Sequence, residues 1–281
     1  METRVDTGMR RRTFLAASAA VPCHLLLASP LALTGCAGAS DTGKPRNIYT
    51  ANRSLYLGRF QKKNRDVQGY LEARIGENDA RFITRVAARR FEELLPGLPE
   101  LAGPEDEATK WLVVGAWHAA YYRTMKPEGY KAADVCRMLY DLYDMEIGRI
   151  PREQHLADGK RVMSAGYQTG YTSWTYWTQK RQIPENFVAE FIVGDGEDFD
   201  YGVDYLECAL EKYFEAQEVP EIAPYFCLAD FQLSRVRETG LRRKGTLAQG
   251  NGRCDFRFKA GRPVTQCWET EVPKFRARGI G

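Results

Sequence analysis

The sequence has few of the residues on which common hydrolytic and nucleotide-binding sites depend. Its 281 residues include only three histidines, His24, His118 and His155. It contains no His-Glu-x-x-His pair, no Gly-x-Ser-x-Gly turn, no phosphate-binding glycine loop and no Gly-x-Gly-x-x-Gly between a strand and a helix. The sequence therefore gives no support to a zinc protease, a serine hydrolase or a nucleotide-binding protein.

A strong charge of either sign is also missing. The chain has 40 Lys and Arg residues against 37 Asp and Glu residues, and part of the small excess lies in the N-terminal segment. Nothing in this balance calls for a nucleic-acid partner. The hydrophobic fraction of 44% and the aromatic fraction of 12% are too high for a disordered chain and ordinary for a folded enzyme.

The N-terminal segment lacks an apolar run long enough for a confident membrane span. Residues 16–33 are small and apolar, but proline, cysteine and histidine interrupt the run at 22–24. Arginines at 10–12 stand just before it, which is typical of a leader for twin-arginine export. We therefore predict a signal peptide over residues 1–35 that engages the twin-arginine export machinery.

The leader ends in Leu33-Thr34-Gly35-Cys36, which resembles a bacterial lipobox. In such a motif the signal peptidase cuts before the cysteine, and a lipid is attached to the cysteine sulfur. We predict lipidation at Cys36 and a lipid anchor that holds the exported protein to a membrane, in the periplasm or at the cell surface. The alternative is an ordinary cleaved leader in which Cys36 is incidental, and the exported protein would then be soluble.

The rest of the chain predicts a tether followed by one globular domain of class α+β. Residues 36–53 are rich in Gly, Ser, Asp, Pro and Asn, which is typical of a tether. Residues 54–281 are long enough to bury a real core. We expect a helical N-terminal half packed with a small antiparallel sheet and a helix in the C-terminal half.

Particular segments predict the elements of this domain. Helices are expected in the first half, each bounded by Pro or Gly, over residues 66–95, 105–125 and 130–147. The second half predicts a buried strand, a helix and a hairpin, over residues 187–193, 203–217, and 241–248 with 253–259. The aromatic run at 167–177 could line an apolar pocket, although such runs are more often part of a core.

The cysteines cannot all pair with one another. Once the leader and Cys36 are set aside, five remain, namely Cys136, Cys208, Cys227, Cys254 and Cys267. An exported protein would be expected to hold disulfides, but a twin-arginine passenger folds first in the reducing cytosol. The export route therefore weakens the argument for disulfides without excluding them.

Cys208 has two interpretations that its spacing leaves open. On a helix at 203–217, an advance of about 100° per residue places Cys208 opposite the apolar stripe of Leu206 and Leu210. A cysteine normally behaves as a small buried hydrophobic residue. Cys208 therefore either packs against a second layer or lines a site.

Cys227 and Asp230 share one face if their segment makes a helical turn. The alternative is a buried cysteine beside an aspartate of a turn. In the last predicted strand, Cys254 lies on one face with two phenylalanines, and Asp255 lies on the other between Arg253 and Arg257. Cys254 is then a site residue or only a core residue, and the arginines would hold Asp255 ionised.

These motifs together resemble the L-2-amino-thiazoline-4-carboxylic acid hydrolase family. The resemblance is carried by Cys208, by Pro-Tyr-Phe-Cys-Leu-Ala-Asp at 224–230 and by Gly-Arg-Cys-Asp-Phe-Arg-Phe at 252–258. It covers about residues 187–259. It implies an enzyme that hydrolyses a small compound with a C–N or C–S bond, and the rival is a non-catalytic lipoprotein of the same fold that binds a small ligand or a metal.

The resemblance also implies roles for particular residues. Opening such a ring needs attack at the amidine-like carbon, a proton donor for the leaving atom and a cation for the carboxylate. The implied nucleophile or metal ligand is Cys208, with Cys227 and Cys254 as partners. Asp230 or Asp255 is the implied acid, base or ligand, and Arg257 the implied carboxylate-binding residue. A metal, if one is bound, would be a divalent ion such as zinc.

One geometric expectation follows for the three cysteines. They can meet only if the predicted hairpin packs across the second face of the predicted helix. Joint metal ligation would hold the sulfurs roughly 3.5–4 Å apart, with Asp230 or a water as the fourth ligand, whereas a disulfide needs one pair of Cα atoms about 4.4–6.8 Å apart. The odd count and the cytosolic folding favour a shared site over a disulfide.

The two histidines outside the leader are weaker candidates. His118 lies in an aromatic helical segment, where a hydrogen-bonded packing role is favoured over a site. His155 lies in a charged stretch that we expect to be exposed.

Overall fold

The computed structural model describes residues 47–101 and 107–280, which belong to one compact unit, Arg46–Gly281. The predicted leader, Cys36 and the tether up to residue 46 lie outside these residues. The end of the predicted tether is folded, because Ile48–Ala51 form helix α1 and Tyr49 is fully buried. Asn47 caps this helix by accepting a hydrogen bond from the Thr50 N–H group at 2.9 Å.

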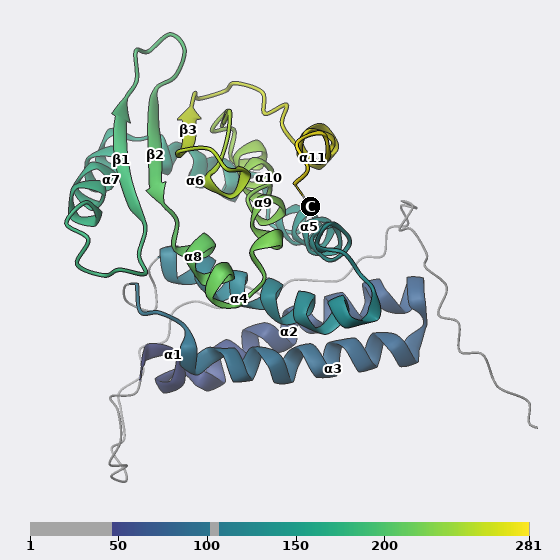
Figure 1. Cartoon of the computed structure of the whole chain (residues 1–281). Helices are drawn as coiled ribbons and strands as arrows, with labels where there is room; N and C mark the ends of the chain where they lie inside the picture. The colour runs from purple at the N-terminus through teal and green to yellow at the C-terminus, as the bar shows by residue number, and fades with distance from the viewer. Residues whose placement is uncertain (1–46, 102–106, 281) are drawn as a thin grey trace, which may run out of the picture. The chain divides into compact units, whose positions relative to one another are not determined.

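The long helix expected at 66–95 is wrong in its bounds, because two helices occupy this region. Helix α2 spans Arg53–Ile75 and helix α3 spans Glu77–Leu94. Between them Gly76 adopts φ of +88°, a conformation that other residues rarely take. Figure 1 shows that the chain turns back here, so that α2 and α3 lie side by side.

The helices of the next segment form the centre of the unit. Helix α4 spans Glu107–Met125 and helix α5 spans Ala132–Gly148, as the sequence predicted within two residues. Buried residues occur around most of the circumference of α4, so it lies inside the helical layer. Helices α6, Arg152–Val162, and α7, Ala165–Thr178, follow.

The C-terminal half contains a three-stranded antiparallel sheet in the order β1-β2-β3. Its strands are Val188–Val193, Tyr201–Glu207 and Cys254–Phe258. Helix α7 packs against β1, as Figure 1 shows. The fold is therefore α+β, as the sequence predicted.

The helix expected at 203–217 is wrong in its first part. Residues up to Glu207 belong to β2, and helix α8 spans only Ala209–Ala216. Tyr201, Val203 and Tyr205 alternate along β2 and contribute to an apolar cluster under α7. Aromatic and β-branched residues favour such a half-buried strand. The apolar residues here alternate along the chain, as in a strand, and this pattern prevails over the helical spacing.

The hairpin expected at 241–248 and 253–259 is also corrected. Strand β3 pairs along its length with β2, and only an isolated bridge joins Arg242 to Arg257. Residues Leu247–Gln249 form a short 3₁₀ helix. The predicted segment is therefore a loop that returns beside the sheet.

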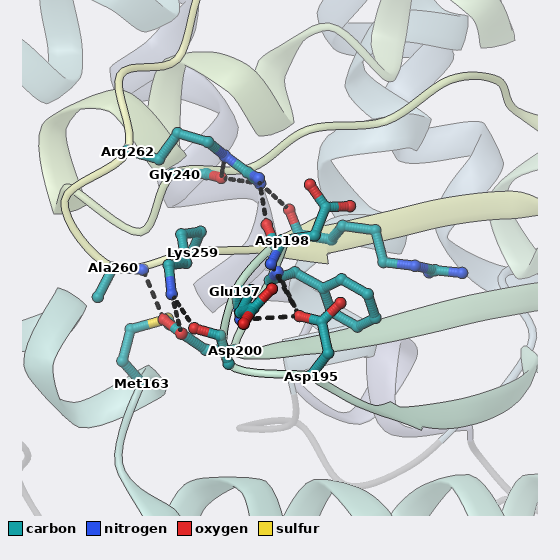
Figure 2. A network of polar contacts seen from close by, with 12 residues as sticks. Met163, Asp195, Glu197, Asp198, Asp200, Gly240, Lys259, Ala260 and Arg262 are labelled. Atoms are coloured by element: carbon teal, nitrogen blue, oxygen red, sulfur yellow. Dashed lines mark hydrogen bonds and ion pairs between the residues drawn. The ribbon is translucent and has the colours of Figure 1, made fainter.

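The turn between β1 and β2 is fastened to the chain that follows β3, as Figure 2 shows. Asp195 accepts hydrogen bonds from the backbone N–H groups of Glu197, Asp198 and Phe199 at 2.8–3.2 Å. Asp200 accepts from Lys259 Nζ at 3.0 Å and from the Ala260 N–H group. These bonds hold the open end of the sheet in place.

The remaining helices lie in the C-terminal half of the chain. They are the 3₁₀ helix at Pro220–Ile222, α9 at Ala223–Phe226, α10 at Ala229–Arg237 and α11 at Trp268–Ala277. No helix among the described residues is both long and apolar enough to cross a membrane.

Candidate functional site

Cys208 lies where β2 ends and α8 begins. It is the N-cap residue of α8 and is half-buried. The predicted helical position opposite Leu206 and Leu210 is wrong, because residues up to 207 are in a strand. Cys208 is therefore positioned by the junction between β2 and α8.

Cys227 and Asp230 lie on either side of the junction between α9 and α10. Cys227 is the C-cap residue of α9, and Asp230 is in the first turn of α10. The one helical turn that the sequence suggested for these residues is present, although it is divided between two short helices.

Cys254 is the first residue of β3 and is buried, with an exposed fraction of 6%. It pairs with Tyr205 of β2, so the two side chains share one face of the sheet with Phe256. The Cys254 sulfur accepts a hydrogen bond from the Leu247 N–H group at 3.2 Å. The alternation predicted for this strand is confirmed.

The structure brings the three cysteines and Asp230 together. Burial raises the pKa of Cys227, and the neighbouring Cys254, Asp230 and Cys208 raise it as well. This mutual influence indicates that the four side chains lie in the same region of the unit, where Arg243 contacts Asp230 and the Cys227 carbonyl oxygen. With Arg243, described next, we call this group the Cys–Asp–Arg site.

Arg243 is the residue of this site that the sequence did not reveal. Its side chain is only 3% exposed and lies between the rings of Phe231 and Phe256, at 4.9 and 4.8 Å from their centroids. Its Nη1 donates to Asp230 Oδ2 at 2.7 Å, and its Nη2 donates to the Cys227 carbonyl oxygen at 2.9 Å. Arg243 belongs to the charged run Arg-Arg-Lys, and nothing in the sequence of this run indicates that Arg243 is buried while Arg242 is exposed.

The site holds its thiols in the protonated form at neutral pH. Burial raises the pKa of Cys208 to about 12, opposed by the backbone of Glu211. Burial raises the pKa of Cys254 to about 11, opposed by the Leu247 N–H group and by Arg243. A reaction that uses one of these thiols therefore needs a proton acceptor close to it.

Asp230 is the carboxylate of this group. Burial raises its pKa, and the charge and hydrogen bond of Arg243 lower it. A third of its side-chain surface remains accessible, because it lines a cavity of about 330 Å³. Asp230 is thus the member of the group that lines a space of small-molecule size.

The cavity lies between α7, the sheet and α10, and we call it the aromatic cavity. Its walls include Tyr167, Tyr171 and Trp174 of α7 and Tyr205 and Phe256 of the sheet. The aromatic run on α7 therefore does line an apolar pocket, which was the less favoured of its two interpretations.

Asp255 and Arg257 do not join the Cys–Asp–Arg site. They lie on the opposite face of β3 and line a separate cavity of about 770 Å³. Asp255 Oδ1 accepts the N–H groups of Lys244 and Gly245 at 2.9 Å, which shapes the loop before β3. Arg257 Nη1 donates to the buried Asp204 at 2.7 Å. Their predicted roles in the chemistry of the cysteines therefore find no geometric support.

The five described cysteines are free thiols. Among the described residues, no group of three or more His, Cys, Asp or Glu side chains is arranged to hold a metal ion. The metal-centred form of the shared site therefore gains no support from these side chains.

The histidines lie outside this site. His118 Nδ1 lies 2.9 Å from the Val114 carbonyl oxygen, and its ring meets Phe226 edge to face, so its predicted packing role is confirmed. His155 was expected to be exposed, which is wrong. It is buried, and its Nε2 lies 2.8 Å from the Ile147 carbonyl oxygen.

The fold and the site define an α+β protein with a buried group of thiols, a carboxylate and a guanidinium beside a small-molecule cavity. A family comparison matches residues 112–258, just over half of the chain, to the L-2-amino-thiazoline-4-carboxylic acid hydrolase family. The chain belongs to this family, and every residue of the Cys–Asp–Arg site lies in the matched region. Comparisons with curated proteins and with solved structures gave no match.

Proposed function

We propose that the protein is a hydrolase that opens a small compound at an amidine-like carbon bonded to nitrogen and sulfur. The observation that carries the proposal is the meeting of Cys208, Cys227 and Cys254 with the Asp230–Arg243 pair, inside the region that matches the family. These residues come from three separate parts of the chain. Asp230, which belongs to this group, also lines the aromatic cavity, and this favours a site over independent core positions.

In the proposed reaction Cys254 is the nucleophile. Its proton passes to Asp230 as the sulfur bonds to the amidine-like carbon, and the leaving ring atom then takes that proton as its bond to the carbon breaks. Water then attacks the same carbon. One of its protons passes through Asp230 to the departing Cys254 sulfur, and the other goes to the amidine nitrogen as the carbon becomes the carbonyl of the product. One water is consumed and one ring bond is broken, while the enzyme returns to its starting form.

Arg243 has a positioning role in this scheme. It fixes Asp230 through a 2.7 Å charged hydrogen bond and lowers the pKa of Cys254 and of Cys227. It is itself held by Gln266, whose side chain bonds both the N–H and the C=O group of Arg243. Gln266 thus fixes the backbone of Arg243, and Asp230 and the Cys227 carbonyl oxygen fix its guanidinium.

Turnover by variants of the full chain tests the proposal. With 2-amino-thiazoline-4-carboxylate and related cyclic amidines as substrates, Cys254→Ser and Asp230→Asn should each lower kcat/KM by about 100-fold or more. Cys267→Ser, which changes a cysteine at the start of α11 outside the site, is the matched control and should retain activity. Thermal unfolding should show that all three variants fold.

Two outcomes would contradict the scheme. Equal activity per folded molecule in Cys254→Ser removes this thiol from the chemistry. If Cys208→Ser abolishes turnover and Cys254→Ser does not, the nucleophile is Cys208, as the family resemblance first implied.

A second candidate function is a lipoprotein that binds a small ligand without turnover. The raised pKa of Cys208, Cys227 and Cys254 favours it, because a protonated thiol is a weak nucleophile. Saturable binding of cyclic amidines with no product would support this alternative.

We also propose that the protein works outside the cytosol, exported by the twin-arginine route and anchored through Cys36. The support is the arginine pair and the lipobox-like sequence alone.

A further inference from the structure

We propose that the aromatic cavity binds an organic acid with a flat aromatic or conjugated ring, whose carboxylate is bound by Arg237. The inference rests on the proposed function, since it describes the part of the substrate that lies beyond the reacting carbon. It assigns the carboxylate-binding role to a residue other than Arg257.

The walls of the cavity suit a flat ring. On α7, the spacing of Tyr167, Tyr171 and Trp174 places all three rings on one helical face. Tyr167 stacks on Tyr171 with ring centroids 5.6 Å apart, and Tyr171 lies 5.2 Å from Trp174. Aromatic surfaces of this kind bind planar ligands by stacked or edge-to-face contact.

The opposite wall is aromatic as well. Tyr205 lies 5.3 Å from Phe256, and Tyr201 stacks on Phe258 at 4.9 Å. The hydroxyl groups of Tyr171 and Tyr205 are hydrogen-bonded to each other at 2.5 Å. The two walls therefore meet at Tyr171 and Tyr205, and this pairing satisfies both hydroxyl groups without a ligand.

Most polar groups at the α10 end already have partners. Asp230 accepts from Arg243. The hydroxyl groups of Ser234 and Thr239 are 2.8 Å apart and bonded to each other. These groups do not require a ligand.

Arg237 is different. Its Nε is buried and has no hydrogen-bond partner among the described residues, and its only ion pair there is a long contact of 3.4 Å to Asp158. A buried donor without an acceptor costs free energy, and a guanidinium matches a carboxylate with two parallel hydrogen bonds. Arg237 is the cationic side chain among the residues that line this cavity, and it also borders a second cavity of about 350 Å³. An anionic ligand would pair with it beside the carboxylates of Glu107 and Asp230 on the same walls.

The size of the cavity fixes the class of ligand further. Its volume of about 330 Å³ lies within the range of ordinary small-molecule sites, which begins at roughly 300 Å³. A bare five-membered ring acid would leave much of this aromatic surface uncovered. A carboxylic acid with a larger flat substituent covers it.

Binding of a simple aromatic acid to the full chain tests the inference. We expect 3-phenylpropionate to bind saturably in titration calorimetry, and its neutral amide to bind about 10-fold more weakly or worse, since the amide cannot accept charged hydrogen bonds from the guanidinium. Trp174→Ala and Arg237→Gln should each weaken binding of the acid by about 10-fold or more. Tyr176→Ala and Arg235→Gln, which change exposed residues of the same two helices, are the matched controls.

Two further variants separate binding from structure. Arg237→Lys keeps the charge and should retain part of the affinity. Asp158→Asn removes the partner of Arg237 and should leave the affinity for the acid unchanged or increase it. If Arg237 only joins α6 to α10, Asp158→Asn and Arg237→Gln should instead have the same effect.

The outcomes distinguish this inference from the proposed function. Absence of saturable binding of the acid by the wild-type chain, or equal affinity for the acid and the amide, overturns the inference whatever turnover shows. Binding of the acid without turnover of any cyclic amidine leaves the cavity assignment standing and overturns the hydrolase.

Discussion

At the level of single residues, burial determines which protonation state the protein can use. The thiols of Cys208 and Cys254 are held protonated by the same loss of solvent that makes them a compact group. Burial disfavours the charged form of His118 as well, but because a histidine is charged when protonated, its pKa is lowered where those of the thiols are raised.

The stability of the fold should depend on pH through His118. Burial lowers its pKa from 6.5 to about 4, with a smaller lowering by Lys63 and an opposing effect of the Val114 carbonyl. Because the folded-state pKa lies below the unfolded one, this histidine's contribution is fully present above pH 6.5 and is lost as the pH falls through 6.5 towards 4. Denaturant unfolding at several pH values should therefore show a smaller loss of stability across this window in His118→Gln than in the wild type.

The comparison has an internal reference. At pH 7.5 the histidine is neutral in both states, so the two curves differ there only by packing. Parallel pH profiles for the wild type and His118→Gln would show that His118 does not carry this dependence.

The sequence predicted individual site residues where the local period was clear. Alternation placed Cys254 and Asp255 on opposite faces of the last strand, which is what β3 shows. The sequence could not show that Arg243, and not Arg257, binds Asp230, because the partner of each arginine depends on which face of the sheet packs inward. Arg257 meets Asp204 of a strand that was expected to be a helix.

At the level of elements, the error at 203–217 arises because the segment fits both the helical spacing of apolar residues and the alternation of a strand. The segment 203–217 contains a helical stripe, but its first residues pair with β1 and β3, and a long-range partner of this kind is invisible in one sequence. The helices at 105–125 and 130–147 have no such competitor and were predicted correctly. Sequence reasoning also placed the strands at 187–193 and 253–259 within about a residue of β1 and β3, but it missed the strand between them and the partners of all three.

A glycine in α6 tests how closely two of these elements must approach. A Cβ atom on Gly159 would lie 1.9 Å from the Arg237 carbonyl oxygen of α10. Gly159→Ala should therefore separate α6 from α10 and lower the free energy of unfolding by about 1–3 kcal/mol, the usual cost of overpacking. Denaturant unfolding measures this loss.

A second glycine provides the control. Gly69 lies in the middle of α2, and a Cβ there would meet nothing within 4 Å. Gly69→Ala should raise the free energy of unfolding by about 0.5–1 kcal/mol, because alanine favours a helix. If Gly159→Ala is as stable as Gly69→Ala, the close approach of α6 to α10 is not required.

At the level of the whole molecule, the family match and the folded body have different extents. The match begins at residue 112, inside α4, whereas α1, α2 and α3 lie before it. These earlier helices still supply fully buried residues such as Tyr49, Phe60 and Phe91 to the main core. Helices α1, α2 and α3 are therefore part of the same body as the site, and α3 packs against α4.

The last prediction concerns where this body is sent. If the arginines before the apolar run direct twin-arginine export, replacing Arg11 and Arg12 together by lysine should leave uncleaved precursor in the cytosol. Cys36→Ser is the companion variant. It should remove the lipid and release exported protein from the membrane, provided that cleavage still occurs. Cell fractionation and intact-mass measurement distinguish precursor, lipidated protein and soluble protein.

Since the route carries folded proteins, the five described cysteines should remain free thiols in the exported form. Normal export of the lysine variant would contradict the twin-arginine route, and unchanged membrane attachment of Cys36→Ser would contradict the anchor alone.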